Sequence, residues 1–135
     1  MLYGDEHISR YEETDGEVGF EWGGHGATIL ILTTTGRKSG KERKNALIFQ
    51  EVPGGYAIVS SKGGAPDHPD WHYNLEANPE VKVQIKGDKF KARAHVASSE
   101  EREKIWPKMV KVWPDYNEYV KKTDREIPVV VLERV

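Results

Sequence analysis

The stretch Ala27-Thr-Ile-Leu-Ile-Leu-Thr-Thr-Thr35 decides the fold. It is rich in β-branched residues and stops at Gly36, a pattern typical of a buried strand that runs into a turn. Arg43 to Gln50 reads as the returning strand, and the turn at Pro53-Gly54-Gly55 leads into a third apolar strand, Tyr56 to Ser61. We therefore predict a meander of three antiparallel strands.

A hairpin and a final strand extend this sheet. Residues 81–86 alternate apolar and polar side chains, and after Gly87-Asp88 the alternation resumes over 90–96, which predicts a half-buried hairpin. Ile127 to Glu133 is a nearly continuous apolar run, as expected of a strand in the centre of a sheet.

Two segments interrupt the strands with helical patterns. Pro69 precedes the first, which runs over 70–77 and ends at Asn78-Pro79. The second opens at Ser98, three residues before Glu101, which is the spacing of a capping box. A short third turn is expected further along the chain, so the helices number two or three.

These elements predict a mainly β protein with about six antiparallel strands. In a chain of 135 residues, such strands are best closed as a small barrel, because closure removes their exposed edges. We expect a single domain over 1–135, with an acidic N-terminal arm at 1–24.

The composition excludes several functions. The chain has no cysteine, so disulfide exchange, thiolate nucleophiles and cysteine-ligated metal sites are ruled out, and redox chemistry requires a cofactor. A net charge of −2 argues against nucleic acid as a partner. The sequence has no apolar stretch long enough to span a bilayer and no signal peptide, so we expect a cytoplasmic protein.

Positive charge is concentrated at the turn between the first two predicted strands. Glycines there allow backbone amides to approach a ligand, and hydroxyls and cations suit a phosphate. A solvated surface turn is the alternative, and the order of a P-loop is absent. The cations of this turn are Arg37, Lys38, Lys41, Arg43 and Lys44.

The loop from Ser60 to Trp71 is the second candidate. Gly63 and Gly64 permit close approach of a flat ligand, and Trp71 is placed to cover its face. The alternative is an ordinary connection with Trp71 in the core. His68 and His72 are four residues apart, but Pro69 between them and the absence of a zincin motif argue against a metal site.

Tyr116 and Tyr119 form the third candidate. They are three residues apart, so they share one face of a helical turn. A phenol there can donate a proton to an acceptor that has received hydride. Aromatic core packing is the competing explanation.

The motifs, in their order and spacing, resemble the deazaflavin-dependent nitroreductase family over roughly Glu21 to Val135. They are Thr33-Thr-Thr-Gly-Arg-Lys-Ser-Gly-Lys, Ser60-Ser-Lys-Gly-Gly-Ala-Pro with Trp71 and Asn78-Pro79, and Thr123-Asp-Arg-Glu-Ile-Pro-Val-Val-Val-Leu. The resemblance implies a split β-barrel of the FMN-binding type and coenzyme F420, an 8-hydroxy-5-deazaflavin with a phosphate and a polyglutamate tail.

The resemblance also implies roles for individual residues. The phosphate and tail would be held by Arg37, Lys38, Ser39, Gly40 and Arg43. The deazaflavin ring would be lined by Ser60, Ser61, Lys62 and Gly63 and covered by Trp71. Ser61, Tyr116 and Tyr119 match positions near the acceptor and would be the catalytic residues. Trp113 stands where the family's nitroreductase member has a tyrosine, so reduction of bicyclic nitroimidazoles is not expected to carry over.

The function implied is hydride transfer from reduced coenzyme F420 to quinones, activated enones or nitroaromatics. An FMN-loaded reductase and a non-catalytic F420 carrier are the alternatives. We expect a cytoplasmic monomer or homodimer, either in solution or in peripheral contact with a membrane, with no metal.

Overall fold

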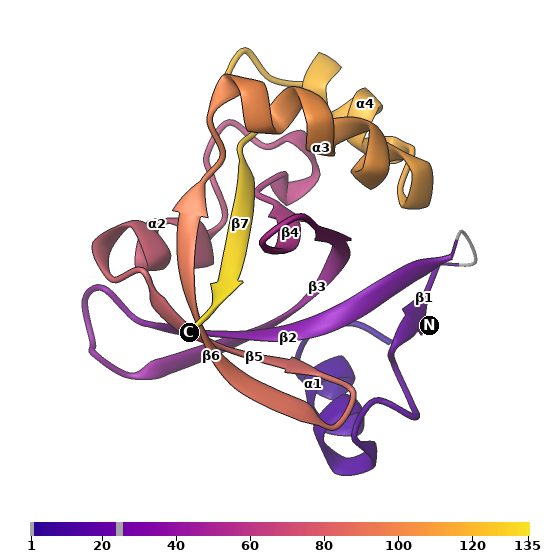
Figure 1. The fold of residues 1–135 in the computed structure, drawn as a ribbon, viewed down its shortest axis with the longest axis vertical. Coiled ribbons are helices and arrows are strands. Elements are labelled where there is room, and N and C mark those ends of the chain that lie inside the picture. The colour runs from indigo at the N-terminus through magenta and orange to yellow at the C-terminus, as the bar shows by residue number, and fades with distance from the viewer. Residues whose placement is uncertain (1, 24–25) are drawn as a thin grey trace.

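The computed structural model describes residues 2–23 and 26–135, and antiparallel strands form its centre (Figure 1). The strands pair in the order β1-β2-β3-β4-β7-β6-β5, and an additional pairing of β2 with β5 closes β2 to β7 into a barrel. The strands are β1 (Glu21–Trp22), β2 (Ala27–Thr35), β3 (Glu42–Val52), β4 (Gly55–Val59), β5 (Glu80–Ile85), β6 (Asp88–Val96) and β7 (Val129–Arg134). The predicted six-stranded antiparallel barrel is confirmed.

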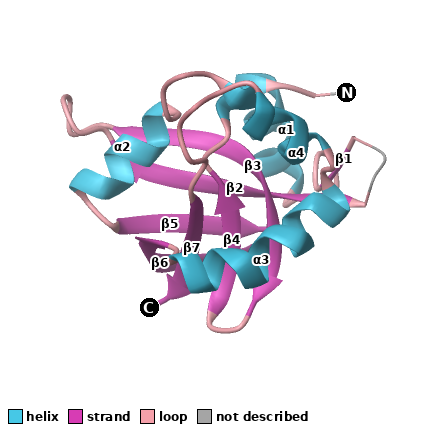
Figure 2. Cartoon of the chain, turned by 90° about the horizontal axis from the view of Figure 1, so that it is seen from above, coloured by secondary structure: helices cyan, strands magenta, loops and turns pink. Residues whose placement is uncertain are grey.

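The helices lie around this barrel (Figure 2). They are α1 (Gly4–Thr14), the 3-10 helix η1 (Lys62–Gly64), α2 (Asp70–Ala77), α3 (Ser99–Val112) and α4 (Asp115–Lys121). Of these, α2, α3 and the short turn that became α4 were predicted, whereas α1 was not. None of the described helices is long and apolar enough to cross a membrane.

β2 is buried on both faces, which explains its unbroken apolar run. Leu30 and Leu32 point into the barrel and join the inner core. Ile29 and Ile31 point outward and pack against Ile8 of α1. Burial of apolar side chains contributes roughly 25 cal/mol for each Å² removed from water, so packing on both faces stabilises β2.

The acidic N-terminal arm folds onto the barrel as α1. Tyr11 is fully buried, and its hydroxyl donates to the carbonyl of Ile29 at 2.9 Å and accepts from the backbone N–H of Lys86 at 2.7 Å. Glu12 pairs with Lys44 of β3 at 2.6 Å. Few apolar residues of α1 contact the barrel. The helix is therefore stabilised by tertiary packing and not by a long apolar stripe of its own.

The remaining helices cover the barrel at two other places. Trp71 and Leu75 of α2 join the inner core. α3 begins at a capping box, in which the Ser98 hydroxyl accepts from the Glu101 N–H at 3.2 Å and the Glu101 carboxylate accepts from the Ser98 N–H at 3.1 Å. Ile105 of α3 packs on the outer face of the sheet. Together, α3 and α4 form a wall that faces α1.

Candidate active site

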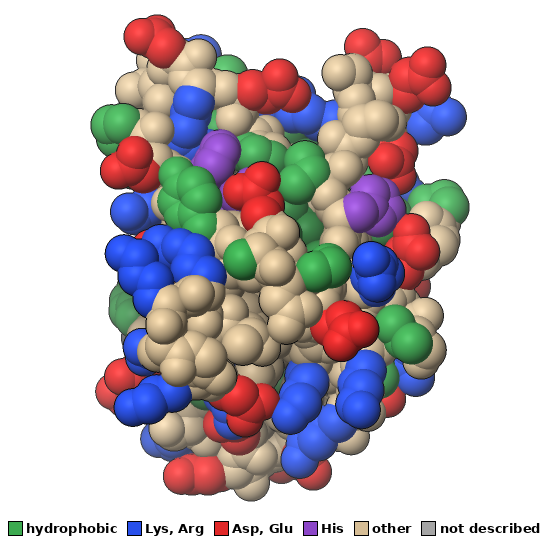
Figure 3. Space-filling model, turned by 90° about the vertical axis from the view of Figure 1, so that its left-hand side faces the viewer, with side chains coloured by type: hydrophobic (Ala, Val, Ile, Leu, Met, Phe, Trp, Pro, Cys, Tyr) green, Lys and Arg blue, Asp and Glu red, His purple; other side chains and the backbone are tan. Residues whose placement is uncertain are grey.

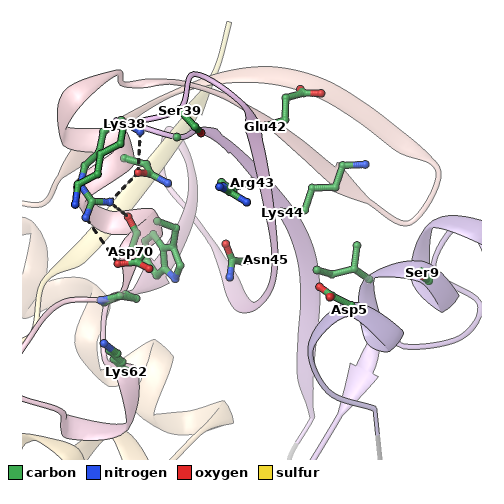
Figure 4. Close-up of a pocket in the computed structure, with 16 residues that line it drawn as sticks. Asp5, Ser9, Lys38, Ser39, Glu42, Arg43, Lys44, Asn45, Lys62 and Asp70 are labelled. Atoms are coloured by element: carbon green, nitrogen blue, oxygen red, sulfur yellow. Dashed lines mark hydrogen bonds and ion pairs between the residues drawn. The ribbon is translucent and has the colours of Figure 1, made fainter.

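The turn between β2 and β3 forms one wall of a cavity of about 920 Å³ (Figure 4). The beginning of α2 and Lys62 also line it, and α1 contributes Asp5 and Ile8. In Figure 4, Asp70 and Lys62 lie on the same side as Lys38, and Asp5 lies on the other side. We call it the basic cavity, after the cations that line it: Arg37, Lys38, Arg43, Lys44 and Lys62. Lys and Arg side chains gather in patches on the face of the protein that carries this turn and α2 (Figure 3).

Backbone hydrogen bonds close the β2–β3 turn. The N–H of Gly36 donates to the carbonyl of Lys41, and the N–H of Gly40 donates to the carbonyl of Gly36, both at 2.8 Å. Gly40 has a φ of +71°, a conformation that glycine adopts without a steric cost. Gly40 does not line the basic cavity. Gly40 therefore shapes the turn, and its expected contact with the cofactor stays a prediction.

Arg37 is tied to α2. Its backbone N–H and its guanidinium both donate to the side-chain oxygen of Asn74, at 3.1 and 3.0 Å, and the Asn74 amide donates to the Thr34 hydroxyl at 3.2 Å. The side chains of Lys38 and Arg43, by contrast, make no hydrogen bond or ion pair with any residue that the structure describes. Their charges are therefore fully available to an anionic ligand.

A second cavity, of about 430 Å³, adjoins the first. We call it the aromatic cavity, since Trp22, Trp113, Tyr116 and Tyr119 line it. Four residues line both cavities, namely Asp5, Ile8, Lys44 and Asn45. The two spaces therefore form one continuous cleft with a cationic end and an aromatic end.

Ser61, Tyr116 and Tyr119, the predicted catalytic residues, all line the aromatic cavity. The hydroxyl of Tyr119 accepts a hydrogen bond from the indole N–H of Trp113 at 3.2 Å. Tyr116 is only 4% exposed, and burial raises the pKa of its phenol, with a smaller contribution from Tyr119. Tyr116 thus belongs to the core as well as to the cavity, so both explanations of its position hold.

Ser60 and Ser61 point in opposite directions. Ser60 is fully buried, and its hydroxyl lies 2.6 Å from Nδ1 of His72. The expectation that Ser60 lines the cofactor ring is therefore wrong for its side chain, because the hydroxyl is directed into the protein. Ser61 faces the aromatic cavity and Lys62 the basic cavity, so this loop contributes to both ends of the cleft.

His72 is the partner of Ser60 and is itself buried. Burial is the main cause that lowers the pKa of His72 to about 4, and the neighbouring His68 and Arg125 lower it further. At neutral pH the ring is therefore uncharged. The ring centroids of His68 and His72 are 4.3 Å apart and the ring planes are tilted by 42°. No group of His, Asp or Glu side chains in the described part of the chain is placed to bind a metal ion.

Trp71 belongs to two environments at once. Its side chain is 5% exposed and packs in the inner core, yet it also lines the basic cavity. The core position, which was the alternative for Trp71, is therefore confirmed, and the role of the ring in covering the cofactor stays a prediction. The ring is a wall that is fixed by core packing and has an edge at the cleft.

Sequence reasoning missed several contributors to the cleft, among them Asp5, Ile8 and Asn45. Asp5 and Ile8 come from α1, which was not predicted, and Asn45 lies on β3 next to the basic turn. Arg125 had no predicted role, yet it donates to three backbone carbonyls of the loop after β4. An arginine two residues before Ile127-Pro128 and an apolar strand was the only available signal.

Comparisons with known proteins agree with this geometry. The family model of the F420H(2)-dependent quinone reductases matches residues 4–134. An F420H(2)-dependent quinone reductase of Mycobacterium tuberculosis is 34% identical over 136 residues, which covers 95% of this chain and 87% of the relative.

Solved structures give the same result. An F420-H2 dependent reductase, FDR-A, is 47% identical with a TM-score of 0.72 and covers 78% of this chain and 93% of its own. A domain-swapped dimer is 42% identical with a TM-score of 0.75 and covers 95% of both chains. The heme storage protein HutZ of Vibrio cholerae, at 15% identity and a TM-score of 0.64 over 99% of this chain and 92% of its own, shares the fold alone.

Proposed function

This chain belongs to the F420H(2)-dependent quinone reductase family, and we propose that it passes hydride from reduced coenzyme F420 to a quinone held in the aromatic cavity. The observation that carries this proposal is the continuous cleft, whose cationic end adjoins an end lined by aromatic rings and hydroxyls. A cofactor with an anionic tail and a flat ring matches such a cleft along its whole length.

The basic cavity fits the anionic part of the cofactor. The side chains of Lys38 and Arg43 have no hydrogen-bond or ion-pair partner among the described residues. A phosphate can therefore accept charge-assisted hydrogen bonds from both. Lys62 lines the same cavity, below Asp70 in Figure 4. We therefore assign phosphate and tail binding to the turn cations, with Ser39 as an additional hydroxyl.

The cofactor ring is assigned to the junction of the two cavities. Trp71 forms a rigid wall on one side. Gly63 has a φ of +64°, and a Cβ at this position would meet no other atom within 4 Å. The absence of a side chain at Gly63 thus leaves open space beside the cleft, where a flat ring system can lie against the backbone.

When bound, the reduced cofactor supplies two electrons and one proton equivalent as hydride. The residues of this chain orient the acceptor and supply a proton, since hydride and one proton convert a quinone into a hydroquinone. Tyr119 and Ser61 place hydroxyls at the aromatic cavity, where negative charge develops on the acceptor oxygen. Donors at that position stabilise the transition state more than the ground state.

Steady-state oxidation of reduced F420, with and without menadione, tests this function. Quinone-dependent oxidation is expected, whereas tight binding without turnover would favour a carrier. Titration of the apoprotein with FMN and with F420 tests the cofactor, and stronger FMN binding would contradict the proposal. Activated enones and nitroaromatics are further acceptors to compare with the quinone.

The assembly and the location also remain parts of this proposal. A monomer and a homodimer are both compatible with the cleft, and one relative is a domain-swapped dimer. Sedimentation measures the oligomeric state. Cosedimentation with anionic vesicles separates a protein that stays in solution from one in peripheral contact with a membrane.

A further inference from the structure

Arg125 lies between α4 and β7 and reaches across to the loop that follows β4. Its Nε donates to the carbonyl of Ala65 at 2.8 Å, and its Nη2 donates to the carbonyl of Ser61 at 2.7 Å. Its Nη1 donates to the carbonyl of Ser60 at 3.2 Å. One planar guanidinium thus holds three carbonyls of a single loop, an arrangement that the compact ammonium of lysine cannot reproduce.

His68 accepts the remaining contact. Nη1 of Arg125 lies 2.9 Å from Nδ1 of His68, and because a guanidinium only donates, Nδ1 must be an acceptor. Burial and the charge of Arg125 both lower the pKa of His68, so the neutral ring is favoured. Arg125 therefore connects the loop to the residues just before α2.

The loop that Arg125 holds has an uncommon backbone. Lys62, Gly63 and Gly64 have φ values of +46°, +64° and +84°, and for a lysine this left-handed conformation is unfavourable unless surrounding contacts impose it. On the other side α4 packs tightly, since a Cβ on Gly64 would lie 2.8 Å from the carbonyl oxygen of Tyr119. The loop is thus gripped between Arg125 and α4.

We propose that Arg125 is the positioning residue of the cleft. It sets the loop so that Ser61 faces the acceptor and Lys62 faces the anionic part of the cofactor. Arg125 lines neither the basic nor the aromatic cavity, so it acts through the loop and not by contact with a ligand. This inference rests on the proposed function, because it assigns a purpose to the two faces of the loop.

Arg125→Lys tests the proposal, with Arg102→Lys as the matched control. Arg102 is also partly buried, and its guanidinium donates to one backbone carbonyl, that of Ile127, at 3.1 Å. Arg102 lies on α3 outside both cavities. The two variants therefore remove the same chemical group, but only one of them releases the loop.

Three properties are measured for folded protein: loop mobility as amide hydrogen exchange of residues 60–65, cofactor binding as the Kd for F420, and turnover as kcat and KM with menadione. For Arg125→Lys we expect exchange of the loop to accelerate and the Kd to rise, each at least tenfold, and kcat to fall. For Arg102→Lys all three should stay within twofold of wild type.

Several results would overturn the proposal. One is loop exchange and Kd within twofold of wild type in Arg125→Lys. A second such result is faster loop exchange with unchanged F420 binding and unchanged turnover. A third is faster exchange over the whole chain with an unchanged Kd per folded molecule, which would show a merely structural role. If Arg125→Lys does not fold, His68→Leu is used instead, because it removes only one contact of Arg125. The same changes in loop exchange, Kd and kcat are then expected, though smaller. Unchanged values there would also refute the proposal.

Failure of the proposed function and failure of the positioning role of Arg125 can be distinguished. If wild-type protein neither binds F420 nor reduces menadione, the proposed function is wrong. If wild-type protein does both and Arg125→Lys matches it, only the positioning role of Arg125 is wrong.

Discussion

The indole N–H of Trp113 donates a hydrogen bond to the hydroxyl oxygen of Tyr119, over 3.2 Å. An indole nitrogen can only donate, so the Tyr119 oxygen accepts and its own proton remains available to the aromatic cavity. Tyr116 is different, because burial raises the pKa of its phenol and makes it a weaker acid. The two tyrosines of the cavity are therefore not equivalent proton donors.

Tyr119→Phe is expected to slow quinone reduction by about tenfold or more, since general acids typically contribute 10²–10⁴-fold. Binding of F420 should stay nearly normal, because the hydroxyl lies at the acceptor end. Tyr116→Phe and Ser61→Ala should slow turnover less. Steady-state kcat and the Kd for F420, measured for each variant, separate these effects.

The triple variant of Ser61, Tyr116 and Tyr119 is the stringent form of this experiment. If it retains wild-type turnover on every acceptor that the parent reduces, solvent supplies the proton and these side chains only shape the cavity. Trp113→Phe serves as a companion, because it removes the donor that orients the Tyr119 hydroxyl. A smaller loss than in Tyr119→Phe is expected.

The cations of the basic cavity should divide into two groups. Lys38→Ala and Arg43→Ala should each weaken F420 binding by about tenfold to a hundredfold, as expected for a charge-assisted contact, and leave the melting temperature unchanged. Arg37→Ala should lower both the affinity for F420 and the melting temperature, because Arg37 also donates hydrogen bonds to Asn74 of α2. Titrations at low and high salt check the electrostatic origin, since salt screens exposed charges.

Lys41 provides the control for these cations. It belongs to the same turn but does not line the basic cavity. Equal losses of affinity in Lys41→Ala and Lys38→Ala would mean that general charge attracts the cofactor and that no specific contact exists.

Trp71→Phe should affect stability and binding together. Trp71 fills part of the inner core, so a smaller ring is expected to lower the free energy of unfolding by about 1–3 kcal/mol. Its edge at the basic cavity should also make tryptophan fluorescence sensitive to F420. Loss of stability with unchanged quenching and unchanged affinity per folded molecule would remove Trp71 from the binding site.

Acid should destabilise the protein through His72. Its pKa is lowered to about 4 in the folded state from the usual 6.5, so the unfolded chain binds a proton more readily between these values. Stability is therefore fully present above pH 6.5 and is lost as the pH falls toward 4, by up to about 3 kcal/mol. Urea unfolding of wild type and of His72→Asn over this range measures the contribution.

The comparison with His72→Asn isolates this group from the carboxylates, which titrate in both proteins. Asparagine keeps an acceptor for the Ser60 hydroxyl, which lies 2.6 Å from the histidine ring. An equally steep loss of stability in the variant would show that His72 does not cause it.

The barrel could be predicted from the sequence because each strand carries its own signal. β2 was predicted with its observed bounds, and the capping box at Ser98 located the start of α3. β4 ends at Val59 rather than at Ser61, and the carbonyls of Ser60 and Ser61 accept hydrogen bonds from Arg125. Such long-range contacts leave no trace in a local pattern.

The same reasoning explains what could be predicted of the site. The spacing of Tyr116 and Tyr119 placed both at one cavity, and the charge of the turn located the basic end. α1 escaped prediction because its stability rests on contacts such as the Tyr11 hydroxyl with Ile29 and Lys86, which lie far away in the sequence. The part of the cleft that α1 contributes was therefore missed as well.

Single-turnover mixing tests the central claim most directly. Protein loaded with reduced F420 is mixed with one equivalent of menadione under anaerobic conditions, and the oxidised cofactor and the hydroquinone are measured. The cleft predicts that both form in equal amounts at the same rate, faster than without protein, and that Tyr119→Phe slows both alike. Cofactor that stays reduced on the protein while menadione remains unreacted would contradict the account.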